Sequence, residues 1–138
     1  MITIKKQEIV KLEEVLHLYQ AVGWTNYTHQ PQMLEQALSH SLVIYLALDG
    51  DAVVGLIRLV GDGFSSVFVQ DLIVLPSYQR QGIGSSLMKE ALKDYKDAYQ
   101  VQLVTEETER TLEFYRFMGF ETLSTYDCTG MIWVNREK

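Results

Sequence analysis

The chain has 138 residues, and its 18 acidic against 12 basic side chains give a formal net charge of −6. A composition of 47% apolar and 22% charged residues is typical of a globular chain with a core and excludes a disordered tail or a fibre. The acidic balance, without a run of Lys or Arg, argues against a nucleic-acid partner. No stretch approaches the ~18 apolar residues of a membrane span, and we expect a single domain over residues 1–138.

The single cysteine, Cys128, cannot form an internal disulfide and has no Cys or His neighbours at metal-ligand spacing. We therefore expect no metal site. The N-terminus carries charges where a signal peptide would have its apolar stretch. Together these features predict an unprocessed cytoplasmic protein.

The first half of the chain predicts a strand, two helices and a hairpin, in that order. Alternation at Ile2 and Ile4 indicates a short edge strand, and helical spacing over residues 12–22 predicts a helix that stops at Gly23. A polar and aromatic loop leads to a second short helix that begins near Pro31. Two apolar runs, 42–48 and 53–60, flank a turn and predict the hairpin.

The second half continues with alternating strands and helices. The nearly continuous apolar run 67–75, broken only by Gln70 and Asp71, is typical of a central strand buried on both faces. A helix over 83–95, a short strand over 101–104 and a helix over about 108–118, closed by a left-handed Gly119, follow. Two antiparallel strands, 120–126 and 131–134, complete the order β-α-α-β-β-β-α-β-α-β-β.

The most informative segment, Gln79-Arg80-Gln81-Gly82-Ile83-Gly84, lies between the buried strand and the following helix. Glycines at 82 and 84 allow successive backbone N–H groups to converge at the positive end of that helix, which is a cradle for a pyrophosphate. Taken alone, the glycines also fit a tight strand-to-helix connection. No Lys-Ser/Thr follows as in a P-loop, and the distal acidic residue of a dinucleotide fold is missing.

This segment resembles the Gln/Arg-x-x-Gly-x-Gly/Ala motif of the GNAT superfamily of N-acetyltransferases, including the Val-x-Pro that ends the preceding strand. A second stretch, residues 114–120, is similar to the family's Phe/Leu-Tyr-x-x-x-Gly-Phe signature. The resemblance implies an α/β (α+β) GNAT fold. Its sheet would be mixed and mostly antiparallel, with six to seven strands and about four helices on both faces.

The resemblance also implies acetyl-CoA as cosubstrate. In the family the pantetheine arm pairs with the end of the motif's leading strand, beside a neighbouring strand that splays away, here residues 101–104. The pyrophosphate would lie on the N–H groups of residues 81–85, with charge added by Arg80. The cofactor-binding residues implied are Leu72, Ile73, Val74, Gln79, Arg80, Gln81, Gly82, Ile83, Gly84 and Ser85.

Two residues are candidates for catalysis. Tyr115 takes the family's general-acid position, where a phenol with a pKa near ~10 suits a CoA thiolate; alternatively it is an aromatic contact without a proton role. Asp71 interrupts an apolar strand and could hold or deprotonate the ammonium, or else it is hydrogen-bonded at a bulge or near the strand edge. A histone-type glutamate base is missing, because Phe68 stands near its register.

In this family the first two helices and their connecting loop recognise the acceptor. Trp24 and Tyr27 could wall a pocket for an amine, or they could hold the loop against the helices. His29 could titrate near neutrality and assist deprotonation, although loop histidines are usually only solvated. These three residues are the predicted substrate-binding set.

The predicted function is acetyl transfer from acetyl-CoA to a primary amine of a small molecule or peptide, by direct attack. A non-catalytic acyl-CoA sensor with the same fold is the main alternative, and a binder of another nucleotide is a third. We expect no nucleic-acid or membrane partner, and homodimer formation is left open.

Overall fold

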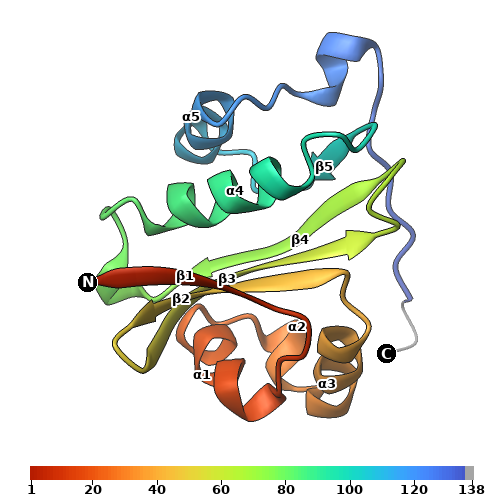
Figure 1. The fold of residues 1–138 in the computed structure, drawn as a ribbon. Helices are drawn as coiled ribbons and strands as arrows, with labels where there is room; N and C mark the ends of the chain where they lie inside the picture. Colours follow the sequence, from red (N-terminus) through yellow and green to blue (C-terminus); the bar gives the residue numbers. More distant parts are fainter. Residues whose placement is uncertain (136–138) are drawn as a thin grey trace. The chain divides into compact units, whose positions relative to one another are not determined.

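A computed structural model describes residues 1–135 of the chain (Figure 1). The chain divides into two compact units, and the boundary between them falls between Val104 and Thr105. The expectation of one domain over residues 1–138 stays a prediction. No helix in residues 1–135 is long and apolar enough to cross a membrane.

The first unit carries the sheet and four of the α-helices. Its elements in chain order are β1 (Ile2–Gln7), α1 (Leu12–Ala21), α2 (Thr25–Thr28), α3 (Pro31–Ser39), β2 (Val43–Asp49), β3 (Ala52–Gly61), β4 (Val67–Val74), the 3-10 helix η1 (Pro76–Tyr78), α4 (Ile83–Asp94) and β5 (Val101–Leu103). The second unit carries α5 (Glu109–Phe117) and the 3-10 helix η2 (Leu123–Tyr126). The short helix α2 was expected to be loop.

Within residues 1–135 the sheet has five strands in the order β1-β2-β3-β4-β5. The first four pair antiparallel, and β4 pairs parallel with β5. The predicted mixed, mostly antiparallel sheet is therefore confirmed, but the predicted count of six to seven strands is wrong.

The two C-terminal strands that the sequence predicted do not form. Residues 120–126 instead end in η2, where short-range bonds such as Thr125 N–H to the Thr122 carbonyl (3.0 Å) replace a ladder. Residues 131–134 are not in a strand, and Met131 and Trp133 are 95% and 86% exposed. Apolar content alone does not make a strand, and within the described residues neither segment belongs to the sheet.

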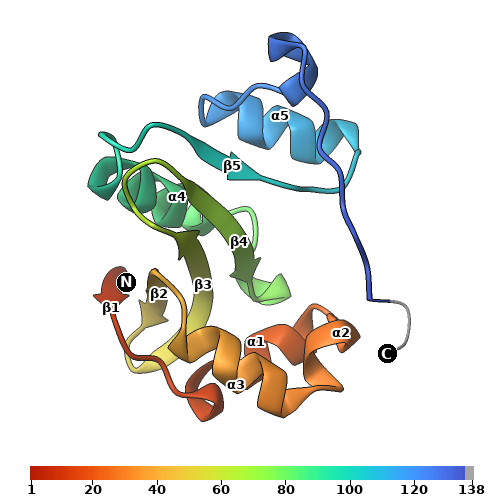
Figure 2. The same cartoon turned by 90° about the vertical axis from the view of Figure 1, so that its right-hand side faces the viewer.

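Helices cover both faces of the sheet in the first unit, as predicted (Figures 1 and 2). The helices α1 to α3 pack on one face, where Leu18 and Leu34 meet Leu46 and Leu56 in the main apolar cluster. The amphipathic helix α4 covers the other face with Ile83, Leu87, Met88 and Ala91. The strands β2 to β4 are consequently buried on both sides, which explains their nearly continuous apolar runs.

The contact between α4 and the sheet depends on Gly55 of β3. A Cβ at Gly55 would lie 2.9 Å from the Ile73 carbonyl oxygen and 3.4 Å from Leu87 Cδ1. We expect Gly55→Ala to lower the free energy of unfolding by roughly 1 to 3 kcal/mol, the usual effect of overpacking a core. Urea unfolding measures this change, and a variant as stable as the parent would show that the α4 layer is loosely packed.

Candidate functional site

The strand β4 has an open backbone edge along its second half. It pairs with β3 from Val67 to Val74, but with β5 only through Val67, Phe68 and Val69. Beyond Val69 the strands β4 and β5 diverge (Figure 2). This confirms the expectation that the strand predicted at 101–104 splays away from its neighbour. Backbone groups from Gln70 to Val74 are left without a strand neighbour on that side within the described residues, and an extended ligand can pair with such an edge.

Three predicted residues, Leu72, Ile73 and Val74, lie on this open stretch. Ile73 is buried in the apolar cluster beneath the sheet, while Leu72 and Val74 are half-buried. The Val74 carbonyl accepts a hydrogen bond from Gln79 Nε2 (3.1 Å). Gln79 therefore fastens the strand end to the turn that follows.

The turn from β4 into α4 uses two residues with positive φ. Arg80 has φ +65° and Gly82 has φ +79°, and the Gln81 side chain donates to the Ser77 carbonyl (3.4 Å). A left-handed conformation is unstrained at glycine and costs an ordinary residue roughly 1 to 2 kcal/mol. The backbone of this turn is thus bent sharply enough to bring the start of α4 next to the open edge of β4.

The N-terminus of α4 lacks a side-chain cap. Gly82 is the N-cap residue, and the first helical bond runs from Ser86 N–H to the Gly82 carbonyl (3.0 Å). The N–H groups of Ile83, Gly84 and Ser85 therefore precede the helical ladder, and a Cβ built at Gly82 would meet nothing within 4 Å. Arg80 is exposed and makes no ion pair among residues 1–135. A phosphate group could bind here, because the N–H groups at the start of α4, the positive end of the helix dipole and the Arg80 guanidinium all attract an anion.

Asp71 lies inside the protein, which disfavours the expectation that it holds or deprotonates the ammonium. It is 3% exposed and forms an ion pair with Arg58 Nε (2.7 Å from Oδ2). The hydroxyl groups of Tyr19 and Tyr27 also donate to its carboxylate, at 2.8 and 3.0 Å. The ladder shifts register between Arg58 and Leu59, so that Gln70 is the extra residue of a bulge. This placement favours the alternative of a hydrogen-bonded carboxylate at a bulge.

The predicted substrate-binding residues lie in or beside α2, in different surroundings. Tyr27 is only 8% exposed, and its ring contacts Tyr19 edge-on at 5.1 Å between centroids. Trp24 is half-buried, with its ring 6.1 Å from that of Tyr19, and His29 is exposed. Tyr27 thus holds the loop against the helices, which was the alternative interpretation. Trp24 and His29 keep exposed surface.

Sequence reasoning missed two members of the cluster around Asp71, namely Arg58 and Tyr19. Burial lowers the pKa of Arg58, but the neighbouring Asp71 carboxylate outweighs this and leaves that pKa raised. Burial, and then Asp71, raise the pKa of Tyr19 and of Tyr27, so both phenols stay protonated as donors. One signal was available, because Arg58 is the only charged residue in the apolar run 53–60.

Tyr115 lies on α5 of the second unit. Its half-buried ring packs edge-on against Phe114 and Phe120, at 5.0 and 6.0 Å between centroids. Burial raises the pKa of Tyr115, and a hydrogen bond with Thr105 partly opposes this rise. Gly119, with φ +101°, ends the helix as predicted, and Phe120 N–H donates to the Tyr115 carbonyl (2.9 Å). The phenol is therefore protonated at neutral pH.

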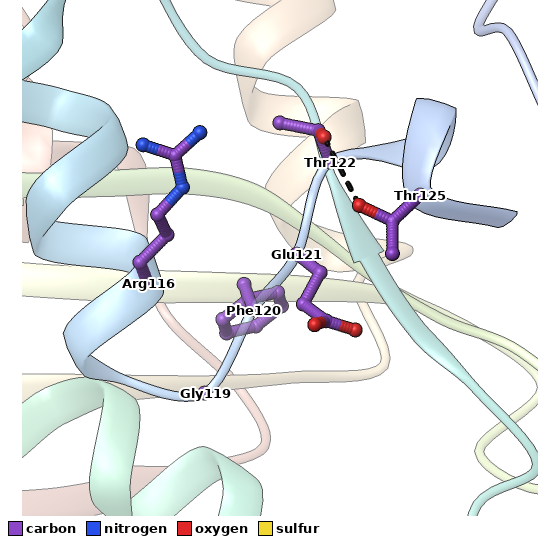
Figure 3. Close-up of a pocket in the computed structure, with 6 residues that line it drawn as sticks. All are labelled: Arg116, Gly119, Phe120, Glu121, Thr122 and Thr125. Carbon is purple, nitrogen blue, oxygen red and sulfur yellow. Dashed lines mark hydrogen bonds between the residues drawn. The ribbon is translucent and has the colours of Figure 1, made fainter.

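A pocket of about 400 Å³ also lies in the second unit, at the end of α5 (Figure 3). A hydrogen bond joins the hydroxyls of Thr122 and Thr125 on its wall (3.5 Å). It is lined by Arg116, Gly119, Phe120, Glu121, Thr122 and Thr125. None of the residues predicted to act in catalysis or to bind the cofactor or the substrate lines it. Residues 1–135 contain no group of His, Cys, Asp or Glu side chains that could hold a metal ion.

Comparison with known proteins gives concordant results. A model of the Acetyltransferase (GNAT) family matches residues 9–120. A solved GNAT-family acetyltransferase from Streptococcus pneumoniae TIGR4 is 86% identical, with 99% of both chains covered and a TM-score of 0.91. Rice serotonin N-acetyltransferase 2 is 30% identical over 66% of this chain, but that match spans only 48% of the rice protein. An aminoglycoside N-acetyltransferase solved with CoA shares the fold, with a TM-score of 0.73, 15% identity and 99% and 95% of the two chains covered.

Proposed function

Since the chain belongs to the GNAT acetyltransferase family, we propose that it transfers an acetyl group from acetyl-CoA to a primary amine of a small molecule or peptide. The observation that carries the proposal is the open edge of β4, which a short turn connects to the uncapped N-terminus of α4. The unpaired backbone groups of the β4 edge can form hydrogen bonds with the amides of the pantetheine arm. The backbone N–H groups of residues 83–85 can donate hydrogen bonds to the diphosphate. The CoA bound by the aminoglycoside enzyme of the same fold supports this assignment.

The proposed reaction is a direct transfer. The neutral amine nitrogen attacks the thioester carbonyl carbon, a C–N bond forms, and the C–S bond breaks as the sulfur leaves with its electron pair. The Tyr115 phenol donates a proton to that thiolate and is reprotonated from solvent. The amine gives up its own proton to water. At neutral pH the phenol of Tyr115 carries the proton that this step requires, because burial raises its pKa further above neutrality.

The proposal does not assign Asp71 the role of general base. Its carboxylate already accepts hydrogen bonds from three donors and is nearly inaccessible to solvent. We instead propose that the exposed surfaces of Trp24 and His29 contact the acceptor. The name of the rice relative, a serotonin N-acetyltransferase, supports an amine as the acceptor class.

A thiol-release assay tests the function. The purified chain is incubated with acetyl-CoA and a panel of primary amines, and free CoA thiol is measured together with the mass of the acetylated product. We expect amine-dependent thiol release with at least one amine of the panel. Binding of acetyl-CoA without release for any amine would favour the alternative, a non-catalytic acyl-CoA sensor.

Two matched glycine substitutions test the proposed diphosphate site at the N-terminus of α4. Gly82→Ala and Gly50→Ala both place a Cβ in open space at a positive φ, so each variant should lose roughly 1 to 2 kcal/mol of unfolding free energy. Only Gly82→Ala should also weaken acetyl-CoA binding, by roughly tenfold, which corresponds to one lost charge-assisted hydrogen bond. Isothermal titration calorimetry measures the difference. Equal affinities for both variants would place the diphosphate elsewhere.

We also propose that the chain forms a homodimer. The support is the apolar run Met131, Ile132, Trp133, whose members are 95%, 86% and 86% exposed, because such runs are typical of interfaces. Replacing Ile132 and Trp133 by Ser should shift the species in light scattering from dimer to monomer. A monomeric parent chain would contradict this.

A further inference from the structure

Four buried side chains form the centre of a polar network within the first unit. Asp71 Oδ2 accepts from Arg58 Nε (2.7 Å) and from the Tyr19 hydroxyl (2.8 Å), while Oδ1 accepts from the Tyr27 hydroxyl (3.0 Å). Arg58 Nη2 donates to the Tyr27 oxygen (3.2 Å), and Nη1 donates to Ser41 Oγ (3.2 Å). Arg58, Asp71, Tyr19 and Tyr27 are all at most 8% exposed. No buried side-chain nitrogen or oxygen in residues 1–135 lacks a partner.

The network lies where the sheet opens. Arg58 and Asp71 face each other across β3 and β4, directly beside the bulge at Gln70. Pairing between β4 and β5 ends one residue earlier, at Val69. The bulge that carries Asp71 is therefore the point at which β4 passes from a central strand to an open edge.

The network also connects that point to the helical layer. Tyr19 belongs to α1 and Tyr27 to α2, and the Trp24 ring lies 6.1 and 6.3 Å from the two tyrosine rings. Trp24 and His29 flank α2, so the hydroxyl of Tyr27 is the direct bond between this short helix and β4. A four-residue helix has little stability of its own, and such contacts determine where it sits.

A buried ion pair is a weak source of stability, because desolvation of two charges offsets most of their attraction. Apolar side chains of similar volume would hold the layers together about as well. A polar network in which every group is hydrogen-bonded has a different effect. Its hydrogen bonds can all form in only one arrangement of the groups, so the network fixes the relative positions of the elements that carry them.

We propose that the Arg58–Asp71–Tyr19–Tyr27 network is a positioning device that fixes α2, with Trp24 and His29, relative to the open edge of β4. This inference rests on the proposed function, in which the edge holds acetyl-CoA and the α2 segment meets the acceptor. Tyr27 and Asp71 are then positioning residues for the acceptor amine and take no part in proton transfer.

A matched pair of tyrosine variants tests the inference. Tyr27→Phe removes the bond to Asp71, and Tyr45→Phe removes a comparable bond, from the buried Tyr45 hydroxyl to Asp94 Oδ2 (2.6 Å), on the α4 side of the sheet. We expect Tyr27→Phe to raise the KM for the amine roughly tenfold or more, as a small misplacement of a substrate site does. The Kd for acetyl-CoA should not change. Tyr45→Phe should change neither constant.

A second readout does not depend on turnover. In a Trp133→Phe background Trp24 is the sole tryptophan, so its emission reports the α2 segment alone. We expect Tyr27→Phe to shift the Trp24 emission maximum and lower its anisotropy, and Tyr45→Phe to leave both unchanged. Identical emission and an identical amine KM in the two variants would overturn the inference while the parent's activity stands. A parent chain without acetyl-CoA binding would overturn the proposed function instead.

Discussion

Replacing Tyr115 by Phe should lower kcat at least roughly a hundredfold, the usual contribution of a positioned general acid. The ring keeps its edge-on contacts with Phe114 and Phe120, so the fold of α5 should not change. The Kd for acetyl-CoA should also stay the same, because the lost hydroxyl acts only on the leaving thiolate. Steady-state thiol release and calorimetric titration measure the two constants.

Tyr99→Phe is the control for this variant, because Tyr99 is 84% exposed and belongs to the first unit. It should match the parent in kcat. The pH profile gives a second check: burial raises the pKa of Tyr115, so the acid form persists at neutral pH and the rate should fall only as pH rises through that elevated pKa. A Tyr115→Phe enzyme with parental kcat would remove the phenol from the mechanism.

Replacing Asp71 by Ala should destabilise the protein by roughly 3 to 5 kcal/mol, the usual effect of leaving one member of a buried ion pair uncompensated. Arg58 is 4% exposed and would lose its only carboxylate partner within residues 1–135. The hydroxyls of Tyr19 and Tyr27 would lose their acceptor at the same time. Guanidinium unfolding at neutral pH measures the change.

Two further variants separate the buried charge from the loss of packing. Asp51→Ala, in an exposed turn, should alter stability by less than about 0.5 kcal/mol. Arg58→Met combined with Asp71→Leu removes both charges and should regain most of the stability that Asp71→Ala loses. A double variant as unstable as Asp71→Ala would mean that packing, and not the unpaired charge, dominates.

Local sequence signals predicted most of the first unit. The alternation at Ile2 and Ile4, the helix stop at Gly23 and the glycine segment before Ile83 depend on neighbours a few residues away, and each is found as expected. The open edge of β4 was anticipated from the family motif at residues 79–84. These features are encoded by spacing and by backbone conformational preference.

Contacts between distant residues account for what was missed. Nothing near Asp71 in the sequence indicates that Tyr19, 52 residues away, donates to it. A carboxylate in an apolar strand fits a solvated site as well as a buried pair, and only the packing of α1 and α2 on the sheet decides between them. The strands expected at 120–126 and 131–134 also depend on pairing with residues distant in the sequence, and neither segment belongs to the sheet within the described residues.

Thermal unfolding with and without acetyl-CoA, with AMP and NAD as controls, tests whether the β4 edge and the N-terminus of α4 bind acyl-CoA. A ligand at roughly 100 times its Kd should stabilise the protein by about 2.7 kcal/mol. We expect acetyl-CoA to raise Tm and the two other nucleotides to leave it unchanged. An unchanged Tm at millimolar acetyl-CoA, or an equal rise with AMP or NAD, would contradict the proposal that the β4 edge and the N-terminus of α4 form an acyl-CoA site.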